Sequence, residues 1–206
     1  MHQKQLVTAG KPLQKAERAL ILVHGRGANA RDILSLADYL NVPDFALLAP
    51  AATNHTWYPF SFMAPQAANE PWLSSALAIL ESVFDDATNA GIAPGNIYLG
   101  GFSQGACLAL EFAARQTRKP GGVLAFSGGL IGQEIDRSNY QTNFEQTPIF
   151  IGCSDVDPHI PRRRVEESGD VLSEMNAAVT VHIYPGMGHT VNDDELQFVN
   201  EHILPL

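Results

Sequence analysis

The amino-acid sequence predicts an α/β fold, in which a mostly parallel central sheet is covered by helices on both faces. Short apolar runs bounded by turn residues alternate along the chain with longer segments of helical periodicity. Most of the short runs are apolar at consecutive positions, which is typical of strands buried on both faces. No repeat or linker divides the sequence, so we expect a single domain over residues 1–206.

Six apolar runs are the expected strands. In chain order they are ALILV at 19–23, FALL at 45–48, IYL at 97–99, VLAF at 123–126, PIFI at 148–151 and VTVHIY at 179–184. The expected helices are residues 30–40, 71–90, 104–115, 161–175 and 193–202. In the second of these helices, Leu73, Leu77, Leu80 and Phe84 are spaced to lie on one face. Asn29 is a suitable N-cap for the first.

Composition argues against several classes of partner. Charged residues make up 17% of the chain and the formal net charge is -9, so we expect no binding to nucleic acid. No apolar run is long enough to cross a bilayer, and the first residues do not resemble a signal peptide. We therefore expect a cytoplasmic protein without stable membrane insertion. Cys107 and Cys153 are expected to be buried free thiols.

Two clusters of charge have structural interpretations. The basic run from Arg162 to Arg164 is followed by Glu166 and Glu167, which indicates a solvated helix face. The acidic run at 193–195 stands at an expected helix start, where negative charge interacts favourably with the helix dipole. The sequence has no zinc-like Cys/His spacing and no phosphate-binding glycine motif, so we expect neither a metal nor a cofactor.

The segment IYLGGFSQGACLAL, residues 97–110, joins an expected strand to an expected helix. Within it, GFSQG at residues 101–105 fits the pattern G-x-S-x-G of a nucleophile elbow. In such a turn the serine has a strained backbone, and side chains two residues before and after it would collide with neighbouring backbone. Ser103 is therefore expected to project above the carboxyl edge of the sheet, beside a helix N-terminus. A purely structural glycine turn is the alternative.

A base and an acid for Ser103 follow later strands. His189 ends YPGMGH, a glycine-rich loop after the last apolar run, and is the expected base. Asp155 and Asp157 both follow the run at 148–151, and either carboxylate would orient the imidazole and stabilise the imidazolium. The order serine, aspartate, histidine differs from the orders of the two well-known serine-protease classes.

An oxyanion hole is expected where LVHGRGAN, residues 22–29, closes an early strand and leads to a helix. The glycines would let backbone N–H groups approach a ligand, and we expect the N–H groups of Arg26 and Gln104 to be the donors. His24 is interpreted as a structural histidine that bonds nearby loops. For the Arg26 side chain, the sequence leaves open whether it contacts substrate or is solvated.

Residues 51–69 form the longest stretch without clear periodicity and are rich in aromatic side chains. Loops of this length in compact domains are often functional. We expect Trp57 and Tyr58 to bind substrate, with ordinary packing as the alternative. Since little chain is left for a separate lid domain, we expect an open, shallow site.

With these motifs together, the chain resembles the phospholipase/carboxylesterase family of α/β-hydrolases, which includes acyl-protein thioesterases. The resemblance extends from LVHGRGAN through GGFSQGACLAL to YPGMGH, and TWYPF is similar to the family's tryptophan-containing loop. It implies an α/β-hydrolase fold, and it implies that the nucleophile, base and two backbone donors are Ser103, His189, Arg26 and Gln104. The phrase DPHIP matches the family's Asp-Pro-x-Val-Pro as a unit, which favours Asp157 as the acid and keeps Asp155 as the alternative.

The resemblance implies a serine carboxylesterase that acts on a small-molecule ester, with thioesters and lysophospholipids as further substrate classes. A dienelactone-hydrolase-like lactonase is one alternative, against which the serine at the elbow argues, since that group typically has cysteine there. A non-catalytic ligand-binding α/β-hydrolase is another, and it would be expected to have lost a catalytic residue. The oligomeric state stays open, with a homodimer among the alternatives.

Overall fold

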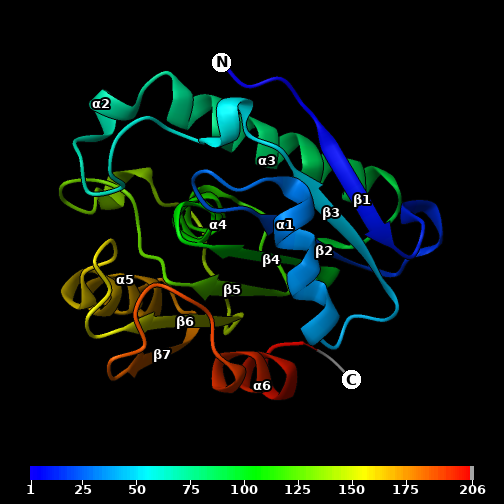
Figure 1. Ribbon diagram of the computed structural model, residues 1–206. Helices are drawn as coiled ribbons and strands as arrows, with labels where there is room; N and C mark the ends of the chain where they lie inside the picture. Colours follow the sequence, from blue (N-terminus) through cyan, green and yellow to red (C-terminus); the bar gives the residue numbers. More distant parts are fainter. Residues whose placement is uncertain (205–206) are drawn as a thin grey trace.

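The computed structural model describes residues 1–204, in which seven strands form one sheet in the order β1-β3-β2-β4-β5-β6-β7 (Figure 1). All neighbouring strands are parallel except β1, which pairs antiparallel with β3. The six expected strands are all present, each longer than its apolar run: β2 (Arg18–Val23), β3 (Phe45–Pro50), β4 (Ile97–Phe102), β5 (Gly122–Phe126), β6 (Pro148–Ser154) and β7 (Ala178–Tyr184).

Strand β1 (Leu6–Gly10) was not among the expected strands. It lies at the edge of the sheet, pairs only with β3 and has no buried residue. An edge strand of this kind lacks the continuous apolar run by which the buried strands were predicted.

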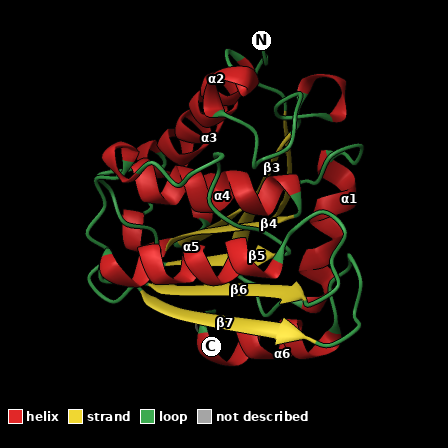
Figure 2. Ribbon diagram, turned by 90° about the vertical axis from the view of Figure 1, so that its left-hand side faces the viewer, coloured by secondary structure: helices red, strands yellow, loops and turns green. Residues whose placement is uncertain are grey.

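The helices cover both faces of the sheet (Figure 2). On one face lie α3 (Trp72–Asn89), α4 (Gln104–Arg115) and α5 (Arg162–Glu174), and on the other lie α1 (Ala30–Leu34) and α6 (Asp193–His202). A short helix, α2 (Gln66–Asn69), precedes α3. The expected helix at 30–40 differs in detail, because a 3-10 turn over Ser35–Tyr39 replaces its second half.

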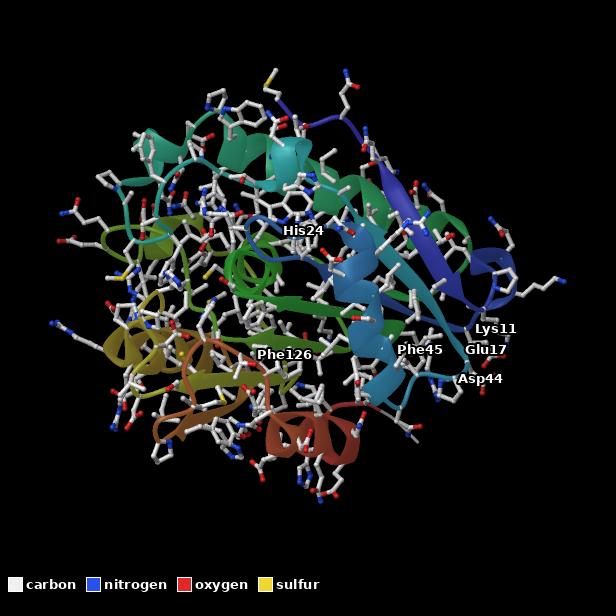
Figure 3. The ribbon with its side chains drawn as sticks, viewed as in Figure 1. Lys11, Glu17, His24, Asp44, Phe45 and Phe126 are labelled. Carbon is white, nitrogen blue, oxygen red and sulfur yellow. The ribbon has the colours of Figure 1, made fainter. Side chains whose placement is uncertain are left out.

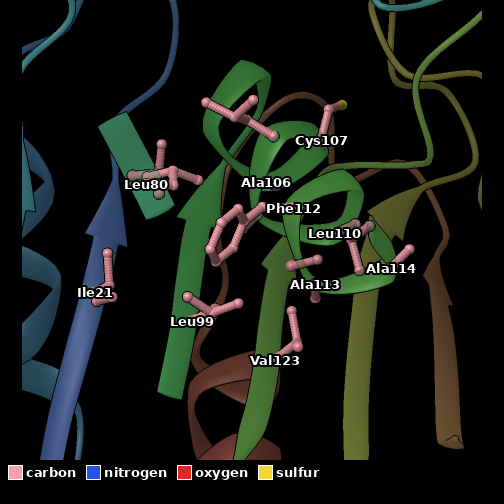
Figure 4. Packing of buried hydrophobic residues seen from close by; sticks show 14 of the residues in the cluster. Ile21, Leu80, Leu99, Ala106, Cys107, Leu110, Phe112, Ala113, Ala114 and Val123 are labelled. Carbon is pink, nitrogen blue, oxygen red and sulfur yellow. The ribbon is translucent and has the colours of Figure 1, made fainter. Parts of the chain in front are cut away.

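The two faces of the sheet have separate apolar cores. Figure 4 shows one of them, in which Leu99 and Val123 of adjacent strands lie beneath Phe112 and Ala113 of α4. Phe112 and its neighbours in this core are almost fully buried, and burial of one such side chain contributes about 1.5–3 kcal/mol. This packing fixes α4 against the sheet, and with it the turn that joins β4 to α4.

One charged cluster lies differently from the expectation of a solvated face. Arg162 is exposed and pairs with Glu166, as expected, but Arg164 is only 4% exposed. Arg164 lies on the same face of α5 as Val165 and Ser168, which are also buried, and this face turns toward the sheet. The helical period therefore carries one member of the basic run into the interior.

The two ends of the sheet differ in character. His24 follows the carboxyl end of β2, whereas Lys11, Glu17 and Asp44 cluster at the opposite end (Figure 3).

None of the helices within residues 1–204 combines the length and apolarity needed to cross a membrane. The cysteines at 107 and 153 are both buried and free, as expected.

Candidate active site

The turn between β4 and α4 consists of Ser103 alone, since β4 ends one residue before it and α4 begins one residue after it. Its φ of 56° and ψ of -121° are a strained combination for a residue that carries a Cβ. The Ser103 N–H donates to the Phe126 carbonyl at 2.9 Å, and the Cys107 N–H donates to the Ser103 carbonyl at 3.0 Å. These bonds hold the strained residue between β5 and α4.

The glycines on either side of Ser103 are sterically required. A Cβ on Gly105 would lie 2.1 Å from the carbonyl oxygen of Val23, and one on Gly101 would lie 2.6 Å from the Gly105 carbonyl. Both distances are far below contact distance and involve backbone that cannot move aside. The close approach of β2, β4 and α4 at this point therefore depends on the two glycines, as the motif predicts.

Three loops at the carboxyl edge of the sheet bring Ser103, His189 and Asp157 together. His189 Nε2 lies 2.9 Å from Ser103 Oγ, and His189 Nδ1 lies 2.7 Å from Asp157 Oδ2. Because the carboxylate can only accept, Nδ1 carries the proton in this arrangement and Nε2 is free to accept from the serine hydroxyl.

The Asp157 side chain is fully buried and bonded through both oxygens. Oδ1 accepts from the N–H groups of His159 and Ile160 at 2.8 and 3.0 Å. Burial opposes ionisation of this carboxyl, but hydrogen bonds from His189 and from the two N–H groups outweigh it and keep its pKa below the ordinary value. Asp157 is therefore a carboxylate at neutral pH.

Asp155, the alternative acid, has a different contact. Its Oδ1 accepts from the Gly186 N–H at 2.8 Å, so it ties together the loops that follow β6 and β7. The structure places Asp157, the acid that the family resemblance favours, against His189.

A cavity of about 430 Å³ opens beside Ser103 and His189. Its lining comes from the turn after β2, from residues 58–62, from the start of α4 and from the loop after β6. The backbone N–H groups of Arg26 and Gln104, both at this cavity, donate to no other group within residues 1–204. Because neither N–H group is already bonded, both can donate to a bound anion. The Gln104 N–H also lies at the positive end of the α4 dipole, which favours negative charge there.

The structure separates Trp57 from Tyr58. Tyr58 lines the cavity, whereas Trp57 is fully buried and its Nε1 donates to the His24 carbonyl at 2.9 Å. Contrary to the expectation for both residues, only Tyr58 has a position from which it can touch a ligand. Trp57 packs in the apolar core, where the His24 carbonyl satisfies its indole N–H.

Cys107 lines the cavity close to Tyr58. Burial raises the pKa of the Cys107 thiol to about 12, so this cysteine is protonated at neutral pH and is a poor nucleophile. Burial likewise raises the pKa of Tyr58 well above its usual value. Ser103 is therefore the candidate nucleophile in the cavity.

His24 is bonded on both sides of its ring. Nδ1 lies 2.8 Å from the Gly25 carbonyl, and Nε2 accepts from the Ala52 N–H at 3.1 Å. Burial lowers its pKa, so the ring is neutral at neutral pH. His24 thus joins two loops, as the sequence indicates.

His159 is a cavity residue that the sequence did not predict. Its ring lies edge-on to that of His189, with 4.9 Å between ring centroids. The signal that could have found it is its place two residues after Asp157, in a loop already predicted to carry a site residue.

Residues 1–204 contain no group of three or more histidine, cysteine or acidic side chains that could hold a metal ion.

The sheet, the helices on its two faces and the sharp turn after β4 define an α/β-hydrolase. The sequence model described as phospholipase/carboxylesterase matches residues 4–205, and the chain belongs to this family of carboxylic ester hydrolases.

Known relatives agree with this assignment. A phospholipase/carboxylesterase of known structure from Dyadobacter fermentans is 50% identical, with a TM-score of 0.97 over 99% of this chain and 98% of its own. Acyl-protein thioesterase 1 of Saccharomyces cerevisiae is 28% identical over 90% of this chain and 91% of its own length. The Bacillus cereus carboxylesterase, at 24% identity, has a TM-score of 0.77 over 96% of this chain and 92% of its own, and shares the fold.

Proposed function

We propose that the protein is a serine carboxylesterase that works through an acyl-enzyme on Ser103, with His189 as base and Asp157 as the orienting acid. The observation that carries the proposal is the continuous hydrogen-bonded chain of these three side chains, of which Ser103 and His189 line a cavity. Its distances, 2.9 Å from Ser103 to His189 and 2.7 Å from His189 to Asp157, are those of a nucleophile and base ready for proton transfer.

In the first half-reaction, Ser103 Oγ attacks the ester carbonyl carbon while His189 Nε2 takes the hydroxyl proton. The carbonyl oxygen becomes an oxyanion that accepts from the N–H groups of Arg26 and Gln104. When the intermediate collapses, the bond to the leaving alcohol breaks and His189 returns the proton to that oxygen. In the second half-reaction a water molecule repeats the attack on the acyl-enzyme, and the carboxylic acid and free Ser103 are released.

Asp157 is suited to the charge that develops on His189. It stays ionised because its hydrogen bonds lower its pKa, and it lies on the Nδ1 side of the ring. A fixed carboxylate there keeps the imidazole in the tautomer that accepts from serine, and it stabilises the imidazolium formed during attack.

The natural acyl and leaving groups fall within ester, thioester or lysophospholipid chemistry. Relatives named acyl-protein thioesterase 1 and lysophospholipase-like protein 1 make the last two classes the first to test after simple esters. A lactone belongs in the same panel, because ring opening would use the same three residues.

The test is turnover of p-nitrophenyl acetate, butyrate and octanoate, together with a thioester, a lysophospholipid and a lactone. Ser103→Ala should lose kcat by about 10⁴-fold or more and should lose labelling by a fluorophosphonate. Asp157→Asn should lose kcat by about 10³–10⁴-fold, whereas Asp155→Asn should stay within about tenfold of wild type. Turnover that persists in Ser103→Ala would refute the proposal, and the reverse ranking of the aspartates would reassign the acid.

A further inference from the structure

The two residues that offer N–H groups to the oxyanion also bind one short segment through their side chains. We call this segment, residues 57–60, the pocket segment, since three of its residues line the cavity. The Gln104 side chain is buried; its Oε1 accepts from the Trp57 N–H at 2.9 Å, and its Nε2 donates to the Tyr58 carbonyl at 2.8 Å. The start of α4 is thereby joined to the pocket segment.

The Arg26 side chain, from the turn after β2, binds the same segment. Its Nη1 donates to the carbonyl of Pro59 at 3.0 Å, and its Nη2 donates to the carbonyls of Tyr58 and Phe60 at 2.9 and 2.8 Å. Among the described residues, no carboxylate lies within ion-pair distance of this guanidinium. The side chain is thus bound to three consecutive neutral carbonyls, through charge-assisted hydrogen bonds that are stronger than neutral ones.

The two sets of bonds meet at one atom, because the Tyr58 carbonyl oxygen accepts from both Arg26 and Gln104. Two further bonds join the turn after β2 to the same region. The Gly27 N–H donates to the His55 carbonyl at 2.8 Å, and the Trp57 indole donates to the His24 carbonyl at 2.9 Å. The turn after β2, which carries the Arg26 N–H, and α4, which carries the Gln104 N–H, are therefore both bonded to the pocket segment, and this fixes their relative position.

We propose that the side chains of Arg26 and Gln104 are positioning residues, which set the spacing of the two oxyanion donors by fastening both to the pocket segment. The pocket segment then acts on the rate of the chemical step as well as forming a wall of the cavity. The physical reason is that oxyanion stabilisation depends on donors fixed in advance, so a small displacement costs much of the rate. This inference rests on the proposed function, because it takes the acyl transfer at Ser103 as given.

An acetyl ester separates this role from that of a pocket wall. Its single methyl group makes little use of the cavity, yet its oxyanion needs both donors. If the pocket segment were only a wall, loosening it would raise KM for octanoate and leave acetate unchanged. If the segment positions the donors, loosening it lowers kcat for both esters.

The experiment compares Arg26→Met, Arg26→Lys and Gln104→Leu with wild type on p-nitrophenyl acetate and octanoate; each variant keeps its backbone N–H. We expect kcat for acetate to fall by about 10- to 100-fold in Arg26→Met and in Gln104→Leu, with KM for acetate within about threefold of wild type. Arg26→Lys should recover only part of kcat, because one ammonium cannot span three carbonyls. The double variant should lose less than the product of the single losses, since both side chains act on one carbonyl.

The matched control is Arg31→Met on α1, which removes an exposed arginine five residues from Arg26 and should leave kcat unchanged. Thermal unfolding of each variant corrects the kinetics for any unfolded fraction, and Arg26→Lys serves where Arg26→Met does not fold. An acetate kcat within about twofold of wild type in folded Arg26→Lys and Gln104→Leu would overturn the proposal. Absence of Ser103-dependent turnover in wild type would instead refute the proposed function, so the two failures are distinguishable.

Discussion

Arg26 and Arg164 make the same kind of contact in two different parts of the molecule. Each guanidinium donates to three carbonyls of one loop, and for Arg164 these are Leu130, Gly132 and Gln133, at 3.1, 2.6 and 2.8 Å. The surroundings of the two arginines differ, and this difference separates a contact that stabilises the fold from one that serves the site.

Arg164 is buried on α5 and also pairs with Glu167 at 3.1 Å. Arg26 is exposed and lies in a turn at the cavity, and among the residues that the structure describes its guanidinium binds carbonyls alone. Loss of a buried arginine leaves carbonyls unpaired in the interior, whereas water can reach the carbonyls that an exposed arginine releases. We therefore expect Arg164 to matter mainly for stability and Arg26 mainly for the rate of the reaction.

The largest effect on stability is expected for Arg164→Met. The buried carbonyls of Leu130 and Gly132 and the part-buried carbonyl of Gln133 lose their donor, so the free energy of unfolding should fall by about 3–5 kcal/mol in urea denaturation. For Arg26→Met the corresponding loss should be below about 1 kcal/mol. The kcat of folded Arg164→Met should stay within about threefold of wild type. If the two variants instead show equal losses of stability, burial is not what distinguishes the two arginines.

Glu195 extends the comparison to a buried acid that fastens the loop of His189. Its Oε2 accepts from the Asn192 N–H at 2.9 Å, but its Oε1 has no hydrogen-bond partner among the residues the structure describes. Burial raises the pKa of this carboxyl to about 7. The sequence predicts that negative charge at 193–195 is favourable at the start of α6, but for Glu195 burial makes the ionised form less stable than that prediction implies.

The free energy of unfolding should therefore fall as the pH rises from about 4.5 to 7, because the unfolded chain releases the Glu195 proton first. Above pH 7 both states are ionised and the loss levels off, on the order of 3 kcal/mol below the acid-side value. Urea unfolding between pH 4.5 and 8 should show a flatter profile for Glu195→Gln and greater stability at pH 8. The exposed Glu201→Gln on the same helix is the control and should keep the wild-type profile. Identical profiles for all three proteins would contradict the raised pKa.

The smallest effect is expected for Glu167→Gln, which removes the ionic partner of Arg164 and leaves its three carbonyls in place. The Glu167 side chain is 46% exposed, so the loss should be below about 1 kcal/mol and should shrink as salt is added. Urea unfolding at low and high ionic strength measures it. A loss close to that of Arg164→Met would show that the ion pair, and not the carbonyl bonds, stabilises this region.

Local sequence patterns predicted much of the fold. The bounds of α4 and α6 agree with the predicted helices at 104–115 and 193–202, because both have clear signals at their first residues. At α4 the signal is the glycine-flanked Ser103, and at α6 it is the acidic run at 193–195; the structure adds that the Asn192 side chain caps α6 in a capping box. β1 and the 3-10 turn after α1 have no comparable signal, since they depend on edge pairing and on local packing.

Sequence patterns alone predict the fold class, the elbow at Ser103 and the loops that carry the candidate base and acid. These follow from periodicity and from the steric demands of glycine, which act between residues a few positions apart. The resemblance favoured Asp157 over Asp155, and the tertiary structure places Asp157 against His189. Only the tertiary structure placed Trp57 in the core and Arg164 in the interior. It also brought the side chains of Arg26 and Gln104 to one carbonyl. Such contacts join residues 30 or more positions apart, and packing of the helices on the sheet decides which side chains meet there.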